Sequence, residues 1–345
     1  MMEFRPAPQR LPVTRAAVLQ LAAGALERLG LPPKSYASRA GVPLRWLDCD
    51  PEALIPIARV NRLFEEAGRD VDGFGAIAAD VPVEAAGRFG RVVRGGLTVL
   101  DCLERSLAFA PDLGREHGSR LIRDPKTGGV WFARLPSKLI DGYAPQDELL
   151  TVRFTIQIVQ LAAGPDWRPE ALRFRSVEEA TRALESVPAF RGVSAETGAS
   201  SCGVLFSRET LGLLLPEMDC GAVDDLESWQ DEGPAGSLAF SLRQVLLSHL
   251  RANQTVSISS VAESVVVHPR TMQRMLAREG VSYRDVLDQA RYVRARELII
   301  RHRDVSLTEI AHELGYGDLA AFSRAFRRWS GAPPSELRLR LDMDS

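Results

Sequence analysis

Cysteine and histidine are scarce in this chain of 345 residues. The five histidines form no cluster, and the four cysteines stand far apart, at Cys49, Cys102, Cys202 and Cys220. Structural metal sites need such ligands at short, regular spacing, so the sequence predicts no metal site and no cofactor. We expect reduced, mostly buried thiols. A redox-sensing thiol is the alternative, although no activating motif supports it.

Long apolar segments are also missing, and none reaches the length that spans a membrane. The alanine-rich residues 16–29 have about the length of a signal-peptide core, but Gln20, Glu27 and Arg28 interrupt them. Their apolar positions instead fit an amphipathic helix that starts near Thr14. The sequence therefore predicts a cytoplasmic protein with no membrane partner.

Two common catalytic signatures are absent as well, the Gly-rich phosphate-binding loop and the nucleophile elbow. Neither Cys49, within Leu-Asp-Cys-Asp, nor Cys202, within Ser-Cys-Gly, has a cationic neighbour in sequence that would activate its thiol. We therefore predict no catalytic residues and a protein that is not an enzyme.

What the chain does contain is a near repeat close to its C-terminus, residues 257–280 and 306–331. Val261-Ala262 in the first segment corresponds to Ile310-Ala311 in the second, and residues 272–276 correspond to residues 322–326. Small residues let two helices cross closely, while the apolar, polar, Arg, any, apolar pattern buries one helical face and leaves the arginine outside. Each segment is predicted to be a helix-turn-helix.

Capping signals mark where these helices begin. Ser306 followed by Glu309 forms a capping box, and Pro269 suits the first position of a helix. The predicted N-caps are His268, Ser282, Ser306 and Asp318. Between the two units, apolar residues recur at helical spacing from Tyr283 to Arg301. One continuous helix is therefore predicted to join them.

Basic charge is concentrated in the same region. Residues 241–340 contain 16 arginines, no lysine and 10 acidic residues, a net formal charge of +6, although the whole chain has a charge of −2. A local basic surface is typical of nucleic-acid binding. Arginine suits this role because its planar guanidinium can bond O6 and N7 of guanine together.

These residues resemble the AraC/XylS family of bacterial transcription regulators over roughly residues 240–340. The resemblance is carried by Ile310-Ala311, Gly315-Tyr316, residues 322–326 and residues 331–338. It implies that residues 268–277 and 318–329 form helices that enter adjacent major-groove segments. The candidate DNA-binding residues are Arg270, Thr271, Gln273 and Arg274 in the first unit, and Ala320, Ala321, Ser323, Arg324 and Arg327 in the second. We expect the second unit to contribute mainly phosphate contacts, because alanine offers only its methyl group to a base.

Two positions depart from the family pattern. Val266 stands where the second unit has Gly315, and a β-branched residue disfavours positive φ. The turn of the first unit is therefore expected to differ in shape. Leu337 stands where the family usually has an aromatic residue, which should change the packing of the C-terminal segment.

A change in composition divides the chain. Residues 217–236 carry seven acidic residues, no basic ones and a Gly-Pro-Ala-Gly end, which predicts an exposed linker. Residues 237–340 are then an all-α DNA-binding domain with two helix-turn-helix units joined by a long helix, and residues 1–216 an α+β effector or dimerisation domain. The predicted helices of the latter are residues 14–29, 57–67, 99–108, 145–162 and 177–184. Its predicted strands are residues 119–123, 130–134, 172–175 and 204–207, the first two joined by a hairpin turn at residues 124–129.

The N-terminal part resembles the arabinose-binding-type domain of a subset of the same family. Phe89-Gly90 with the later Leu97-Thr98, residues 169–176 and residues 203–216 carry this resemblance, which implies effector binding or dimerisation. The effector-binding residues are unknown from sequence. Several aromatic residues suit either a small-molecule cavity or ordinary core packing, and packing is favoured for most of them: Trp131, Phe132, Tyr143, Phe154 and Phe174.

The sequence thus predicts a transcription regulator that binds double-stranded promoter DNA. The resemblance implies activation through RNA polymerase, a small-molecule effector and a homodimer as further partners. One alternative is a DNA reader fused to a thiol-dependent repair enzyme. The other is a regulator without effector, whose N-terminal domain only dimerises.

Overall fold

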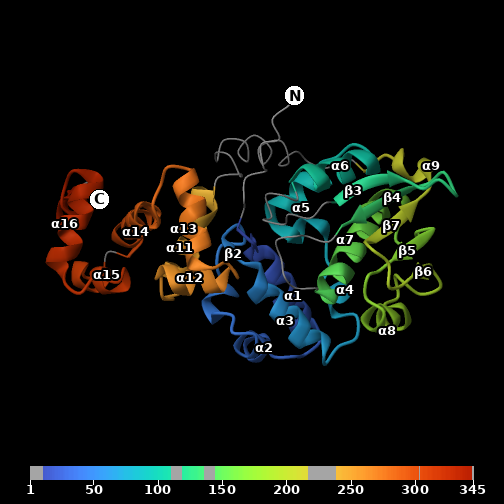
Figure 1. The fold of residues 1–345 in the computed structure, drawn as a ribbon, viewed down its shortest axis with the longest axis horizontal. Helices are drawn as coiled ribbons and strands as arrows, with labels where there is room; N and C mark the ends of the chain where they lie inside the picture. Colours follow the sequence, from blue (N-terminus) through green and yellow to red (C-terminus); the bar gives the residue numbers. More distant parts are fainter. Residues whose placement is uncertain (1–10, 110–118, 136–143, 217–237, 303, 344–345) are drawn as a thin grey trace. The chain divides into compact units, whose positions relative to one another are not determined.

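The computed structural model describes residues 11–109, 119–135, 144–216, 238–302 and 304–343. They form two compact units, one from Pro12 to Pro216 and one from Leu238 onward, each with its own core (Figure 1). The acidic segment 217–236 lies outside the described residues. Among the helices that are described, none is both long and apolar enough to span a membrane.

The N-terminal unit mixes helices with two sheets, as predicted. Its helices are α1 (Ala16–Arg28), α2 (Pro33–Arg39), η1 (Leu44–Trp46), α3 (Ile57–Gly68), α4 (Phe74–Ala78), η2 (Val83–Ala86), α5 (Gly87–Arg94), α6 (Val99–Phe109), α7 (Pro145–Ala163), α8 (Glu178–Ser186) and α9 (Arg208–Leu211). Its strands are β1 (Val13–Arg15), β2 (Leu54–Pro56), β3 (Ser119–Arg123), β4 (Val130–Arg134), β5 (Ala171–Arg173), β6 (Ser194–Glu196) and β7 (Cys202–Phe206). All five predicted helices and all four predicted strands are present, with shifts of one or two residues at several ends.

The main sheet has the strand order β3-β4-β7-β5-β6, in which β5 and β6 run parallel and every other pair is antiparallel. Side chains alternate between its two faces. Helix α7 packs against β7 of this sheet (Figure 1). Phe132, Leu172 and Val204 belong to the large core that includes Leu149 and Ile156 of that helix. Trp131, Ala133 and Leu205 form a smaller cluster of their own. The predicted hairpin joins β3 to β4 in full register.

At two of the shifted ends, a hydrogen-bonded partner overrides the periodic pattern of the sequence. Residues 14 and 15 are not the start of α1, because they pair with Ile55 and Leu54 in a short two-stranded sheet. Ser207 is not in β7, because its hydroxyl accepts a hydrogen bond from the backbone N–H of Thr210 (3.2 Å) and caps α9. Short strands and helices such as β6 and α2 gave no periodic signal and were missed.

The C-terminal unit is entirely helical in its described part, as predicted. Its helices are α11 (Leu238–Arg251), α12 (Ile258–Ser264), α13 (Pro269–Arg278), α14 (Tyr283–Arg301), α15 (Leu307–Glu313), α16 (Leu319–Ser330) and α17 (Pro334–Met343). The predicted caps at His268, Ser282, Ser306 and Asp318 all accept a backbone N–H from the following turn. The predicted joining helix is α14, and it packs against α11, α15, α16 and α17.

The turn of the first helix-turn-helix does not differ from the second, so that expectation was wrong. Val266 has φ +54° and Gly315 has φ +79°. The hydrogen bonds also correspond: the N–H groups of Val266 and Val267 bond to Glu263 and Ala262, as those of Gly315 and Tyr316 bond to His312 and Ala311. Burial of Val261, Ala262 and Val265 beneath the turn fixes the path of the chain, so Val266 adopts a conformation that its side chain disfavours.

Val266→Gly is therefore expected to stabilise the first unit by about 0.5 to 1 kcal/mol, because relief of the left-handed strain exceeds the added entropy of the unfolded chain. The Val266 side chain is 62% exposed, so little packing is lost. The reciprocal change, Gly315→Val, should destabilise the second unit by about 1 to 2 kcal/mol. Hydrogen exchange of peptides from residues 258–278 and 307–330 measures both effects. Faster exchange of residues 258–278 in Val266→Gly would contradict the assignment of strain.

Candidate nucleic-acid interface

The second helix of the first unit, α13, divides cleanly into a buried and an exposed face. Met272, Met275 and Leu276 are buried. Arg270, Gln273 and Arg274 are exposed and Thr271 is half-buried. Arg270 and Arg274 are four residues apart, so they lie on the same side of the helix one turn apart. The Nδ1 atom of His268 accepts the N–H of Arg270 (3.3 Å) and holds the start of the helix.

The second unit repeats this division in α16. Phe322, Ala325 and Phe326 are buried, and a further hydrogen bond from the Ala321 N–H to Asp318 Oδ1 (2.6 Å) caps the helix. The predicted contact residues lie toward solvent: Ala320, Arg324 and Arg327 are exposed, and Ala321 and Ser323 are half-buried. The buried residues pack with Ile310 and Ala311 of α15, and Leu337 covers part of this cluster.

Four arginines of the two second helices differ from those of α14 in what they contact. Among the described residues, the guanidinium groups of Arg270, Arg274, Arg324 and Arg327 make no hydrogen bond and no ion pair. On α14, by contrast, Arg294 pairs with Glu313 (2.6 Å) and with Glu297. These four free cations on α13 and α16 are able to bind phosphates or base edges without first breaking an internal contact.

Other cations near the repeat are held internally, which sequence periodicity does not reveal. The guanidinium of Arg291 lies over the Tyr316 ring at 4.9 Å, and that of Arg296 lies 5.8 Å from the Tyr292 ring centre. Arg328, although it follows Arg327, pairs with Asp288 of α14 (2.7 Å). On the connecting helix, Arg291 and Arg294 thus serve internal contacts.

A chain of ion pairs connects α11, which packs against α13 of the first helix-turn-helix, to α15 of the second through α14. Arg251 of α11 binds both carboxylate oxygens of Glu297 (2.5 and 3.2 Å), Glu297 also pairs with Arg294 (3.4 Å), and Arg294 reaches Glu313 of α15. Burial alone would raise the pKa of Glu297, but the hydrogen bonds and charge of Arg251 and Arg294 outweigh it and lower that pKa. The carboxylate therefore stays ionised near neutral pH, and the chain of pairs ties α11, α14 and α15 together.

A second connection joins α13 to the beginning of α11. Glu279, which ends α13, accepts the backbone N–H groups of Leu238 (2.8 Å) and Ala239 (3.0 Å). These are among the N–H groups that a helix leaves unbonded at its start. The sequence did not suggest this contact, because the partners lie 41 and 40 residues apart. The only feature in the sequence that relates to this contact is an acidic residue, Glu279, just after a predicted helix.

Two family models match the chain. The model described as helix-turn-helix domain matches residues 261–340, and the model described as arabinose-binding domain of AraC transcription regulator, N-term, matches residues 30–215. The second match alone covers more than half of the chain. The chain belongs to the AraC family of transcription regulators.

Relatives of the chain include mycobacterial proteins. An uncharacterized HTH-type transcriptional regulator of Mycobacterium tuberculosis is 43% identical over 82 residues, which cover 23% of this chain and 23% of that relative. The match therefore spans less than a quarter of the relative. The HTH-type transcriptional regulator VirS of M. tuberculosis is 25% identical over 334 residues, 91% of this chain and 92% of VirS. The crystal structure of the transcriptional regulator CdpR from Pseudomonas aeruginosa aligns with a TM-score of 0.41 and 20% identity, over 94% of this chain and 98% of CdpR.

In this AraC-family chain the aromatic residues proposed as cavity candidates mostly pack in the core. Phe132 and Phe174 are buried in the large core of the N-terminal unit. Phe154 stacks on Phe89 with ring centres 5.8 Å apart, and the Arg173 guanidinium covers the Trp131 ring at 4.2 Å. Tyr143 lies outside the described residues. Core packing was the favoured interpretation of most of these residues.

The thiols also bear on the repair-enzyme alternative. Burial raises the pKa of Cys102 to about 11 and that of Cys202 to about 12, so both remain protonated. Cys49 is partly exposed, and its thiol donates to the carbonyl oxygen of Trp46 (3.3 Å). Cys220 lies outside the described residues. A protonated, buried thiol is a poor nucleophile, and the described residues contain no group of His, Cys, Asp and Glu arranged to hold a metal ion.

Proposed function

We propose that the protein is a transcription regulator, chiefly an activator, that binds double-stranded promoter DNA with α13 and α16. The observation that carries this proposal is a set of four exposed arginines on the two second helices that have no hydrogen-bond or ion-pair partner among the described residues: Arg270, Arg274, Arg324 and Arg327. Each pair lies along one side of a well-capped helix, as a helix in the major groove requires. Relatives of the C-terminal segment that are transcriptional activators support activation.

The two helices have different parts in this proposal. Arg270, Thr271, Gln273 and Arg274 of α13 offer guanidinium, hydroxyl and amide groups, which suit base edges. Near the start of α16, Ala320 and Ala321 offer methyl groups only, so this helix contributes mainly phosphate contacts, through Ser323, Arg324 and Arg327. The first unit is thus expected to read more of the sequence, and the second to fix the register on the duplex.

The ion-pair chain through α14 supports the use of both units on one DNA site. Its three links are 15 to 32% exposed and shielded by neighbouring helices, so salt screens them less than surface pairs. A joining helix held in this way keeps α13 and α16 in one arrangement. Less conformational entropy is then lost when both helices bind.

Arg274→Ala is expected to weaken binding to the best site by about 1 to 3 kcal/mol and to relax the preference at one base pair, because a bidentate contact to guanine is lost. The best site is first selected from a random DNA library, and the variant is then measured on all single-base substitutions of that site. Equal weakening on every sequence would rule out base recognition by Arg274 and leave a phosphate contact.

Arg327→Ala serves as the matched comparison. It should weaken all sequences about equally and lower the slope of log affinity against log salt concentration by about one. Arg328→Ala is the control, because this neighbouring side chain already pairs with Asp288 and should leave the slope nearly unchanged. Equal slopes for Arg327→Ala and the unmodified protein would remove Arg327 from the interface.

The remaining parts of the proposal concern partners and domains. We infer that residues 1–216 respond to a small-molecule effector and mediate a homodimer, that residues 217–236 link them to the DNA-binding residues 237–340, and that bound protein contacts RNA polymerase. Sedimentation of the full chain tests the dimer. A purely monomeric chain, with and without DNA, would contradict it.

A further inference from the structure

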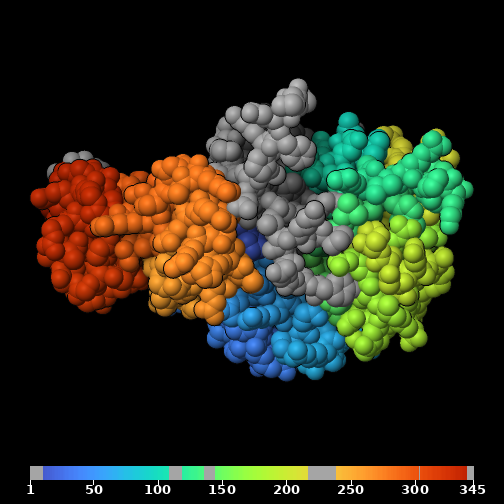
Figure 2. Space-filling model, in the orientation of Figure 1, coloured from blue at the N-terminus to red at the C-terminus, as the bar shows by residue number. Residues whose placement is uncertain are grey.

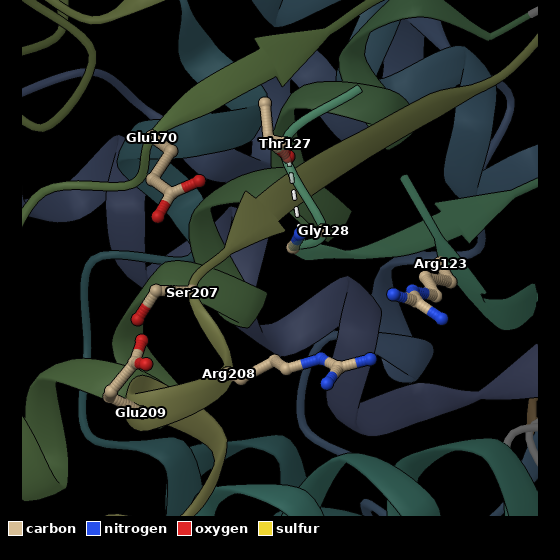
Figure 3. A pocket seen from close by; sticks show the side chains of 8 residues that line it. Arg123, Thr127, Gly128, Glu170, Ser207, Arg208 and Glu209 are labelled. Atoms are coloured by element: carbon tan, nitrogen blue, oxygen red, sulfur yellow. Dashed lines mark hydrogen bonds between the residues drawn. The ribbon is translucent and has the colours of Figure 1, made fainter. Parts of the chain in front are cut away.

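A polar recess lies on the N-terminal unit where three strand ends meet, and neither family resemblance assigns it a role. It has a volume of about 280 Å³ and is lined by Arg123, Thr127, Gly128, Gly129, Glu170, Ser207, Arg208 and Glu209. These residues come from the end of β3, the hairpin turn, the start of β5, and the junction of β7 with α9 (Figure 3). They belong to one unit, in which β3, β4, β7 and β5 are neighbours in the sheet. In the space-filling view of Figure 2, the part of the chain that carries β3 and β4 lies beside the part that carries β5, β6 and β7.

Charge is divided across the recess. Figure 3 shows the guanidinium groups of Arg123 and Arg208 on one side and the carboxylates of Glu170 and Glu209 on the other, with Thr127 and Gly128 between them. Within the described part of the chain, neither guanidinium makes a hydrogen bond or an ion pair. Two exposed cations at one opening repel each other, and a bound carboxylate removes that repulsion. Within the recess, the charge of Arg208 acts on the carboxylate of Glu209.

The carboxylate of Glu209 remains charged near neutral pH. Hydrogen bonds from its own backbone N–H and from the Ser207 hydroxyl hold the pKa of Glu209 below its usual range. Gly129, at the end of the hairpin turn, lies very close to β7. A Cβ atom at this position would be only 2.7 Å from the carbonyl oxygen of Phe206. Close packing of the backbone at this point therefore fixes the spacing between the hairpin, which carries Arg123, and the β7–α9 junction, which carries Arg208 and Glu209.

These features restrict the ligand. Pockets for drug-sized, largely apolar ligands have about 300 to 1,000 Å³ and apolar linings, so this smaller and polar recess fits a small, polar molecule. A simple anion would meet the two carboxylates, and a simple cation would meet the two guanidinium groups. A molecule with a carboxylate at one end and an ammonium group at the other satisfies both sides.

We propose that the recess binds a small zwitterion of amino-acid type, with its carboxylate on Arg123 and Arg208 and its ammonium group on Glu170 and Glu209. This proposal names the chemical class of the effector proposed above. It rests on the proposed function only for the expectation that ligand binding alters DNA binding. The recess borders α9, the last described helix before the segment that leads to the DNA-binding unit. A ligand in the recess thus contacts residues of α9 directly.

The test uses the full chain without DNA and a series of amino acids with increasing charge separation: glycine, 3-aminopropanoate, 4-aminobutanoate and 5-aminopentanoate. Calorimetric titration should show saturable binding that is strongest at one length. Butanoate and butylamine carry only one of the two charges, and they should bind about tenfold or more weakly than the best zwitterion, because each leaves one side of the recess without a partner.

Substitutions of lining residues test whether the zwitterion binds in the recess. Arg208→Gln and Glu170→Gln should each weaken the best zwitterion by about tenfold or more, since each removes one charge-assisted contact. Arg120→Gln is the control: Arg120 is exposed on the same strand as Arg123 but points to the opposite face of the sheet, and this change should have little effect.

Three results would overturn the proposal. The first is no saturable binding at concentrations up to about 20 mM, which corresponds to a binding free energy weaker than about 2.3 kcal/mol. The others are that butanoate binds as tightly as the best zwitterion, or that the Arg208 and Glu170 variants bind it as tightly as the unmodified protein. Because DNA binding is measured separately on the selected site, failure here leaves the proposed regulator intact. Conversely, a protein that binds the zwitterion but no DNA would reject the proposed function alone.

Discussion

Asp147→Ala is expected to destabilise the N-terminal unit by about 3 to 5 kcal/mol, because it leaves a buried guanidinium without its counter-charge. Asp147 lies in the first turn of α7 and pairs with Arg134 at the end of β4. The two side chains are only 8% and 9% exposed. Arg134 also donates to the carbonyl oxygen of Asp147 (3.2 Å) and to the Thr151 hydroxyl, so it joins the sheet to the helix that covers it.

Arg134 cannot escape the penalty by losing its proton. Burial acts to lower the pKa of Arg134, but the charge and hydrogen bond of Asp147, with a smaller contribution from the charge of Glu148, outweigh burial and raise that pKa. Without Asp147 the Arg134 guanidinium must either remain charged in a poorly solvated site or become solvated through local unfolding. Asp147 also supplies negative charge at the start of α7, which adds a few tenths of a kcal/mol through the helix dipole.

Hydrogen exchange of the full chain measures this loss. Peptides from α7 and β4 should exchange at least about a hundredfold faster, since each 1.4 kcal/mol is a factor of ten in the open population. Asp166→Ala is the control, because Asp166 is exposed after α7, and it should change little. Unchanged protection of α7 in Asp147→Ala would show that the pair contributes no net stability, as happens for some buried ion pairs.

Phe322→Ala should have a comparable effect on the second helix-turn-helix, about 3 to 5 kcal/mol. The Phe322 side chain is fully buried between α15, α14 and α16. Its ring lies 5.8 Å from the ring of Phe326 in an edge-to-face arrangement and 5.8 Å from the ring of Tyr316. Alanine removes both contacts and leaves a cavity that α15 and α16 cannot close without shifting.

The loss should be local to the second unit. Peptides from residues 307–330 are expected to exchange much faster, and those from residues 258–278 at nearly the original rate, because Met272 and Leu276 do not belong to the Phe322 cluster. Leu319→Ala, on the same helix but 37% exposed, is the control and should cost less than about 1 kcal/mol.

The same variant should alter DNA binding in a defined way. DNA contacts attributed to α16 should disappear while the base preferences attributed to α13 persist, since Phe322 belongs to the core of the second helix-turn-helix only. If Phe322→Ala abolished every base preference together, α13 would depend on the second unit for its own fold, and the division of tasks between the helices would have to be abandoned.

Much of the C-terminal unit follows from local sequence. Side chains that cap a helix act on N–H groups two or three residues away, so His268, Ser282, Ser306 and Asp318 determine where α13, α14, α15 and α16 begin. The 3.6-residue period then determines which face of α14 and α16 is buried. These local signals also located the hairpin between β3 and β4, because turn residues at 124–129 separate two short segments that contain apolar and aromatic residues.

Tertiary structure alone decided other features. The positive φ of Val266 contradicts the preference of its own side chain, because packing beneath the turn outweighs about 1 to 2 kcal/mol of local strain. The pairing of Arg251 with Glu297 joins residues 46 apart, and no local rule predicts it. The parallel pairing of β5 with β6 was missed for a similar reason, since a three-residue strand shows no periodic pattern.

The candidate site shows the same division. Sequence periodicity placed Arg274 and Arg324 on exposed helical faces, because the apolar positions around them must be buried. It did not distinguish them from Arg291, Arg294 and Arg328, which also lie on amphipathic helices. Only the folded chain separates the two groups, since it brings Glu297, Glu313, Asp288 and the Tyr316 ring to the internal arginines. A charge is free to bind DNA when tertiary contacts leave it without a partner, and contacts between residues distant in sequence decide that.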